Sequence, residues 1–414
     1  MNKSVLISGG SVAGPALAYW LHRHGFTPTV VERAPQLRDG GYAVDFRGEA
    51  LDVLDRMGLL DAVRALDTEM GDAAMVGAEG RRYATLPAAV FAGDLEVLKG
   101  DLTRLLYEAT REDVEYVFGD SIASLRQDAD GVSVTFERGG PRRVGQGGGG
   151  AGRDGEHPAR RGGALGRGRG ARGGPRPCPR DGRPDGLHSK TRALTFGPEE
   201  RFLRHLGIYT AIFNLDNYLG LENTGRLYAV PGKAANIFTA RANTEARAAF
   251  HFAAEGLEYD RRDPASHKRI IAERFAGEGW EVPRLLEEMD AAQEFFFDAN
   301  AQVEMDTWAA GRVVLLGDAA ACAAPTSGRG TSQALIGAYV LAGELAVSGG
   351  DHVAAFAAYE ERMRGYVAEH QALGREGAER FFMPAPTQEI LDMLAANAPE
   401  NTRTEPVRLQ DYGV

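Results

Sequence analysis

The first residues that could do chemistry form a glycine-rich turn near the start of the chain. Gly9, Ser11 and Gly14 occupy the three positions of a G-x-G-x-x-G pattern, between a strand-like run, SVLIS, and a helix-like run, PALAYWLHRHG. Such a turn brings backbone N–H groups, here including those of Val12 and Ala13, to the positive end of a helix dipole, where phosphate oxygens bind. Ser11 replaces the middle glycine and is small enough for a pyrophosphate to approach the backbone.

An acidic residue follows at the distance that suits a dinucleotide. Glu32 ends the next strand-like run, TPTVVERA, 23 residues after Gly9. A carboxylate there accepts hydrogen bonds from an adenosine ribose. The adjacent Arg33 is included in the expected cofactor site. A glycine turn alone is often an ordinary connection between strand and helix, but Glu32 in this position favours dinucleotide binding.

A second glycine motif lies in residues 311–346. An apolar, strand-like run, GRVVLLG, leads into an aspartate, and a Pro/Gly loop and a helix-like run from about Thr331 follow. The aspartate can accept hydrogen bonds from hydroxyl groups, and the loop exposes backbone N–H groups at the start of a helix. The pattern GD-x(6)-P-x-x-G-x-G consists of Gly317, Asp318, Pro325, Gly328 and Gly330. In this loop we expect Cys322 to pack in the interior and Arg329 to be a solvated charge.

The two motifs together resemble those of the flavoprotein aromatic hydroxylases, the group A monooxygenases of the p-hydroxybenzoate hydroxylase fold. Within that group the chain is most similar to the tetracycline-inactivating and polyketide-hydroxylating branch. The resemblance implies an α/β fold, in which a Rossmann-like FAD-binding domain is interleaved with a β-sheet substrate-binding domain and followed by C-terminal helices. It also implies that NAD(P)H reduces FAD, that a C4a-hydroperoxide forms with oxygen, and that an aromatic, polyketide or antibiotic-like molecule is hydroxylated.

The resemblance extends the expected cofactor site to positions outside the two motifs. Asp45 matches an aspartate that contacts FAD, and Arg38 matches an arginine that meets NADPH. Lys99 stands where the group usually has an arginine near the flavin, and it keeps the charge without the planar fork. The run DGLHSKTR matches a motif near the FAD pyrophosphate and the nicotinamide cofactor, and carries over Asp185, Gly186 and Arg192.

The same resemblance predicts a discontinuous division of the chain. The FAD-binding domain is expected over residues 1–70, 99–192 and 300–370, the substrate-binding domain over 71–98 and 193–299, and a C-terminal helical segment over 371–414. Alternating runs between 207 and 255 predict an antiparallel sheet, and helices are expected near 266–276 and 282–292.

Three residues of the predicted sheet are candidates for the substrate pocket: Phe213, Tyr228 and His251. Aromatic residues that alternate along a strand are more often core, and a histidine among them is more often structural than catalytic. The sequence contains no convincing catalytic dyad or triad and no spacing typical of metal ligands. A flavin enzyme needs neither, because the cofactor carries the difficult chemistry.

Residues 139–184 differ from the rest of the chain. These 46 residues include 17 Gly and 11 Arg and only Val144 and Leu165 as large aliphatic residues, so they cannot form a core. The group has an apolar strand directly before the DG motif, where this sequence reads PCPRDGRP. We therefore infer that the gene is read in a shifted frame in this region. A disordered insertion and an arginine-rich arm are the second and third alternatives. Resequencing of the gene tests this inference.

Composition narrows the partners to small molecules. The chain has 414 residues, a net charge of −11 and a pI near 5.4, which argues against a nucleic-acid partner. Two cysteines, Cys178 and Cys322, cannot make a disulfide framework, and no apolar run is long enough for a membrane span. We expect a cytoplasmic protein that binds a small-molecule substrate and molecular oxygen. A flavoprotein reductase that uses no oxygen and an inert ligand-binding protein remain alternatives; a W-x-W-x-I-P halogenase signature is absent.

Overall fold

The N-terminal βαβ unit expected from the sequence is present in the computed structural model, which describes residues 3–37, 42–145, 186–396 and 407–413. Strand β1 (Ser4–Ser8) leads into helix α1 (Ala13–Arg23) and strand β2 (Thr27–Glu32). Strand β2 is parallel both to β1 and to β7 (Glu115–Phe118), so the sheet order is β1-β2-β7. The helix ends just before Gly25, which adopts φ +75° and whose N–H group donates to the carbonyl of His22.

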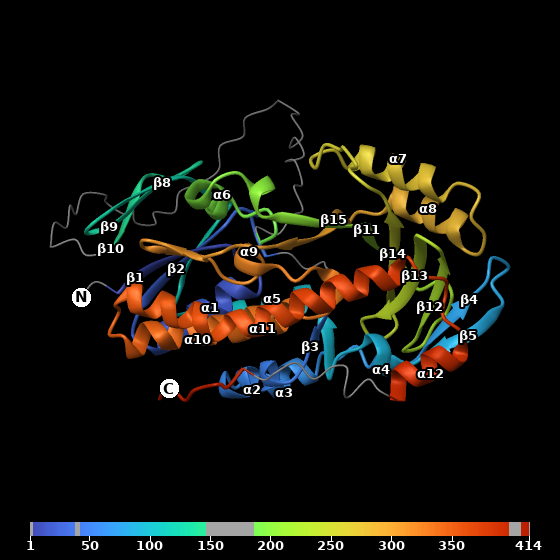
Figure 1. Cartoon of the computed structure of the whole chain (residues 1–414), viewed down its shortest axis with the longest axis horizontal. Coiled ribbons are helices and arrows are strands. Elements are labelled where there is room, and N and C mark those ends of the chain that lie inside the picture. Colours follow the sequence, from blue (N-terminus) through green and yellow to red (C-terminus); the bar gives the residue numbers. More distant parts are fainter. Residues whose placement is uncertain (1–2, 38–41, 146–185, 397–406, 414) are drawn as a thin grey trace, which may run out of the picture.

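The helices of the cofactor side pack into one large hydrophobic core. Helix α10 (Gly330–Val347) is buried along most of its length, so it needs no polar face. It lies between α1 and α11 (His352–Phe381), as Figure 1 shows. The remaining helices of this region are α2 (Glu49–Arg56), α3 (Leu60–Arg64), α5 (Lys99–Glu108), α6 (Lys190–Phe196) and the short α9 (Asp318–Ala321).

Two small antiparallel sheets flank this core. One contains β8 (Ile122–Asp128), β9 (Gly131–Phe136) and β10 (Arg142–Gly145), so the Gly/Arg-rich block begins with a paired strand. Residues 146–185, which include Cys178, Asp185 and most of that block, lie outside the described residues. The other small sheet pairs β3 (Ala43–Phe46) with β6 (Leu95–Leu98).

The sequence prediction for the region 311–317 is only partly met. A strand β17 is present but covers Val313–Val314 alone, and it pairs with the equally short β16 (Ala309–Ala310). Val313 and Val314 are partly exposed rather than buried. In the described part of the chain β17 has no strand partner other than β16.

A seven-stranded sheet forms the other half of the structure, in the order β15-β11-β14-β13-β12-β4-β5. All its neighbouring pairs are antiparallel except β12 and β4. The strands span Ala73–Val76 (β4), Arg82–Leu86 (β5), Leu203–Asp216 (β11), Gly225–Val230 (β12), Lys233–Ala240 (β13), Glu245–Ala253 (β14) and Phe295–Val303 (β15). The antiparallel sheet predicted from residues 207–255 is thus confirmed.

The two faces of this sheet bury different side chains. On one face, helices α7 (Pro264–Phe275) and α8 (Val282–Ala291) cover an aromatic cluster, and both helices lie where the sequence predicts them. The other face is turned toward the cofactor side and the C-terminal segment. There, α11 reaches the sheet, and α4 (Ala88–Phe91) and α12 (Gln388–Ala396) lie beside the edge strand β5.

Candidate cofactor and substrate site

The glycine turn after β1 is shaped by two close backbone contacts. The N–H group of Gly9 donates to the carbonyl of Val31 at 2.8 Å, and Gly9 has φ +108°, which favours glycine. A Cβ atom on Gly14 would lie 1.9 Å from the Gly9 carbonyl oxygen, so only glycine fits. In the described part of the chain, the N–H groups of Ser11, Val12 and Ala13 have no hydrogen-bond acceptor. The turn can therefore offer several donors to an anionic group.

Glu32 holds the same turn from the end of β2. Its Oε2 atom accepts from the N–H group of Gly10 at 2.7 Å, and its Oε1 atom accepts from Ala34 at 2.8 Å. A carboxylate has further lone pairs, so these bonds leave it able to accept from a ribose. The sequence predicted only a ribose contact for Glu32 and did not indicate that this residue orders the turn. Arg33 is exposed at the strand end.

The second glycine motif lies directly against the first. Gly317 has φ +59°, and a Cβ atom on it would lie 3.5 Å from that of Ala13. Asp318 is bordered by Gly186 of the DG motif, where a Cβ atom would approach the Asp318 Cβ to 2.7 Å. A Cβ atom on Gly330 would lie 3.6 Å from Asp318 Oδ1. Segments more than 130 residues apart in the sequence thus converge around one carboxylate.

Arg192 connects the DG and GD motifs. Its side chain is fully buried, and its guanidinium donates to the carbonyl of Ala319 at 3.0 Å and to that of Leu187 at 2.5 Å. It also lies 3.9 Å from the carboxylate of Glu199. These contacts make Arg192 a residue that positions the two loops.

Asp45, in strand β3, borders the site next to the second glycine loop. A Cβ atom on Gly328, which has φ +61°, would lie 3.5 Å from Asp45 Oδ2, while Asp45 Oδ1 accepts from the N–H group of Gly93 at 3.0 Å. Burial raises the pKa of Asp45. Its cross-strand neighbour is Glu96, whose pKa burial raises to about 7. Sequence reasoning missed Glu96, because nothing in the run LEVL indicates that it is buried beside a second carboxylate.

The remaining predicted positions around the loop differ in exposure. The ammonium group of Lys99 lies 5.2 Å from the ring centre of Tyr42, a cation–π contact. Pro325 is exposed, and Cys322 packs in the interior as expected. The prediction that Arg329 is a solvated charge is wrong, since Arg329 is 5% exposed and burial lowers its pKa. Arg38 and Asp185 lie outside the described residues.

These groups fit FAD in kind. The α1 turn offers backbone donors for a pyrophosphate, and Glu32 and Asp318 offer carboxylates for hydroxyl groups. Gly328 and Gly330 bring backbone to the start of the long helix α10. No cluster of His, Cys, Asp or Glu that could hold a metal ion occurs among the described residues. None of the helices that the structure describes is long and apolar enough to cross a membrane.

A cavity of about 340 Å³ lies between the seven-stranded sheet, the second glycine loop and the C-terminal segment. Thr326 contributes from the loop, His251 from β14, and residues 380–381 and 383–386 from the end of α11 and beyond. Its wall is mostly apolar. The cavity therefore adjoins the loop that is expected to hold the flavin.

Of the three expected pocket residues, only His251 lines this cavity. The structure places Phe213 and Tyr228 in the core under α7 and α8, where Phe213 stacks on Phe250 and the Tyr228 hydroxyl donates to Glu278 at 2.7 Å. The difference follows from strand geometry, because side chains alternate between the two faces of a sheet. His251 is on the opposite face from its neighbours Phe250 and Phe252.

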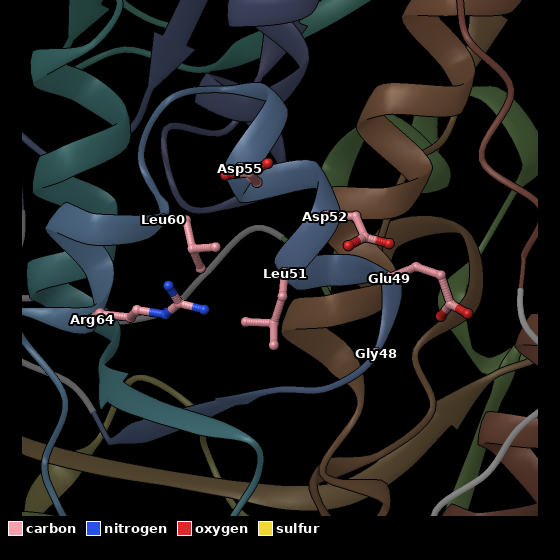
Figure 2. Close-up of a pocket in the computed structure, with 7 residues that line it drawn as sticks. All are labelled: Gly48, Glu49, Leu51, Asp52, Asp55, Leu60 and Arg64. Atoms are coloured by element: carbon pink, nitrogen blue, oxygen red, sulfur yellow. The ribbon is translucent and has the colours of Figure 1, made fainter.

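A second hollow, of about 650 Å³, is open to the surface at helices α2 and α3. Figure 2 shows Glu49 and Asp52 on one side of it, Leu60 and Arg64 on the other, and Asp55 at the top. None of its lining residues belongs to the glycine motifs, and its wall is rich in carboxylates. The cavity beside Thr326 is therefore the candidate substrate site.

Comparison with known proteins agrees with this arrangement. Residues 2–144 match the family described as FAD binding domain. An uncharacterised protein of Mycobacterium tuberculosis (strain CDC 1551 / Oshkosh) is 42% identical over 377 residues, which cover 90% of this chain and 92% of that protein. A flavin-dependent monooxygenase from an unknown prokaryotic organism is 37% identical over 389 residues, covering 93% and 92% of the two chains. The crystal structure of the tetracycline destructase Tet(55) superposes with a TM-score of 0.79 at 34% identity, covering 100% of this chain and 99% of the other.

The chain belongs to the FAD-dependent monooxygenases. It is an enzyme of that class, with the mixed α/β fold expected from its two glycine motifs. The resemblance inferred from the sequence is therefore confirmed.

Proposed function

We propose that this monooxygenase consumes NAD(P)H and molecular oxygen and hydroxylates an aromatic, polyketide or antibiotic-like small molecule in the cavity beside Thr326. One observation carries the proposal: an apolar cavity adjoins the GD loop, whose Gly317 lies against Ala13 of the first glycine turn. The similarity to Tet(55) supports an antibiotic-like or polyketide-like substrate class.

In this proposal the two glycine motifs and the residues around them hold FAD. The turn of Gly9, Ser11, Val12, Ala13 and Gly14 receives the pyrophosphate. Glu32 and Asp318 accept hydroxyl groups, and the loop from Pro325 to Gly330 approaches the flavin ring, with Asp45 and Lys99 nearby. Bound FAD supplies the redox chemistry that links NAD(P)H, oxygen and substrate.

The chain's own residues have to orient both molecules and exclude water. The apolar wall of the cavity keeps water away from the reacting groups. Buried Arg192 keeps the DG and GD loops together, so that Asp318 has a defined position. The predicted domain boundaries and the cytoplasmic location stay predictions.

The experiment is a flavin spectrum of the purified protein with added FAD, followed by NADPH and NADH oxidation and oxygen uptake with a panel of phenolic and polyketide compounds. We expect a bound-flavin spectrum and oxidation that a substrate stimulates together with oxygen uptake. Asp318→Ala should lower FAD affinity about tenfold or more, because a charge-assisted hydrogen bond is lost. Substrate-dependent NAD(P)H oxidation without oxygen uptake would instead indicate the reductase alternative.

A further inference from the structure

The polar groups of the substrate cavity are few, and two of them already have charged partners. Lys233 lies 2.7 Å from the carboxylate of Glu278, and Arg380 lies 3.8 Å from that of Glu376. Asn236, Thr326 and His251 are the other polar side chains of the wall. The cavity therefore has no positive charge without a paired carboxylate among its described lining residues.

His251 is oriented by a chain of two hydrogen bonds across β14, β11 and β15. The Thr210 hydroxyl lies 2.9 Å from His251 Nδ1, and Asn300 Nδ2 lies 2.8 Å from the same hydroxyl oxygen. Strand register supports this geometry, because Thr210 is directly opposite His251. Thr210 is buried and Asn300 is 3% exposed, so neither is readily bonded by solvent.

The direction of these bonds determines where the histidine proton is. Asn300 Nδ2 also faces the carbonyl oxygen of Ile208, at 3.4 Å, so this atom is the amide nitrogen and can only donate. The Thr210 oxygen accepts from it, and the one Thr210 proton can then be given to His251 Nδ1. The proton of the neutral imidazole is then on Nε2.

The imidazole is neutral near pH 7. Desolvation lowers the pKa of His251 to about 4, and the charged groups of the cavity wall, Lys233 and Arg380, are both positive. Among the described residues, Nε2 has no hydrogen-bond partner. The cavity thus contains an oriented, uncharged N–H donor beside the GD loop.

We propose that the Nε2–H group of His251 donates a hydrogen bond to an uncharged acceptor oxygen of the substrate, a ketone carbonyl or a phenol, with Thr210 and Asn300 as positioning residues. The inference rests on the proposed function and adds the chemistry that selects the substrate. A neutral donor in an apolar wall compensates the desolvation of a carbonyl, whereas a carboxylate entering the cavity loses its hydration and has to compete with Glu278 and Glu376 for the cations of the described wall.

Binding of three rigid probes to the FAD-loaded enzyme tests this proposal. 9-Fluorenone carries a ketone, fluorene lacks it, and fluorene-2-carboxylate carries a charge. We expect 9-fluorenone to bind about five- to tenfold more tightly than fluorene, and the carboxylate to bind more weakly than either. His251→Phe should abolish the preference for the ketone and retain fluorene binding, and His251→Gln, which keeps a donor, should restore part of the preference.

The positioning role is tested by Thr210→Val, with Thr239→Val as the matched control because Thr239 is buried in the same sheet and bonds to Thr224 instead. Thr210→Val should lower the ketone preference about threefold and shift the ¹⁵N resonances of His251 away from the Nε2–H tautomer. The control should change neither.

Equal affinities for 9-fluorenone and fluorene in the wild-type enzyme would overturn the proposal, as would a wild-type enzyme that binds neither probe or an Nδ1–H tautomer. These measurements use oxidised FAD and no NAD(P)H. A protein that shows the ketone preference but no oxygen-coupled turnover would therefore refute the proposed function alone.

Discussion

The two faces of the seven-stranded sheet differ although they are made by the same strands. Under α7 and α8, Phe250 packs 4.6 Å from Phe275 and 5.9 Å from Phe213, measured between ring centres. On the opposite face, the neighbouring residue His251 and the strand-partner residue Thr210 form a polar relay at the cavity. One face thus forms a packed aromatic core, and we assign recognition of the substrate to the other.

The largest effect should come from truncating the aromatic face. Phe250→Ala removes a fully buried ring from the cluster, so we expect it to lower the free energy of unfolding by about 3–5 kcal/mol. Chemical denaturation measures this. His251→Phe, at the next position but on the cavity face, is the matched control and should change stability by less than about 1 kcal/mol. Similar losses for both variants would contradict the division between the faces.

Lowering the pH should reduce the free energy of unfolding in part through His251 on the cavity face. Because the folded-state pKa of His251 is about 4 and its ordinary value is 6.5, the unfolded chain takes up the proton first as pH falls. The stability associated with neutral His251 is thus complete above about pH 6.5 and is lost as the pH falls toward 4. Denaturation between pH 7 and 4.5 should show a steeper decline for the wild-type enzyme than for His251→Phe.

Part of the acid sensitivity should remain in that variant. His370 of α11 is fully buried, and desolvation lowers its pKa to about 3, which has the same sign of effect. A His251→Phe curve identical to that of the wild-type enzyme would show that His251 does not titrate as described.

The smallest expected effect concerns Asn236, which is on the cavity face of β13. Its Oδ1 atom is buried and has no hydrogen-bond partner among the residues that the structure describes. Asn236→Leu should therefore raise the free energy of unfolding by about 1 kcal/mol, because it removes an unpaired polar atom. Ile237→Ala, on the helix face, should lower it by about 2–5 kcal/mol. Destabilisation by Asn236→Leu would indicate that this amide has a structural partner.

The sequence predicted the parts of this architecture that depend on local patterns. Gly9, Gly14 and Gly317 mark turns that only glycine tolerates, and period-2 runs mark the strands of the sheet. The sequence could not show which face of the sheet lines the cavity. Alternating residues define two faces of a strand, but they do not show what packs against each face. For that reason the sequence indicates Phe213 and Tyr228 as pocket candidates together with His251.

The other differences between the sequence predictions and the structure arise from contacts between segments that are far apart in the sequence. The burial of Arg329 and the bridge that Arg192 makes between Leu187 and Ala319 depend on loops that meet only in the folded chain. The apolar run before Asp318 contains only the two-residue strand β17, paired with β16, although its composition favours a longer strand.

The most direct test of the account is turnover under ¹⁸O₂ with FAD and NADPH, using a phenolic ketone that binds the enzyme. We predict a product that contains one ¹⁸O atom and that forms much more slowly in His251→Phe. A product without ¹⁸O, formed while NADPH is consumed, would contradict the claim that the cavity beside Thr326 is a hydroxylation site.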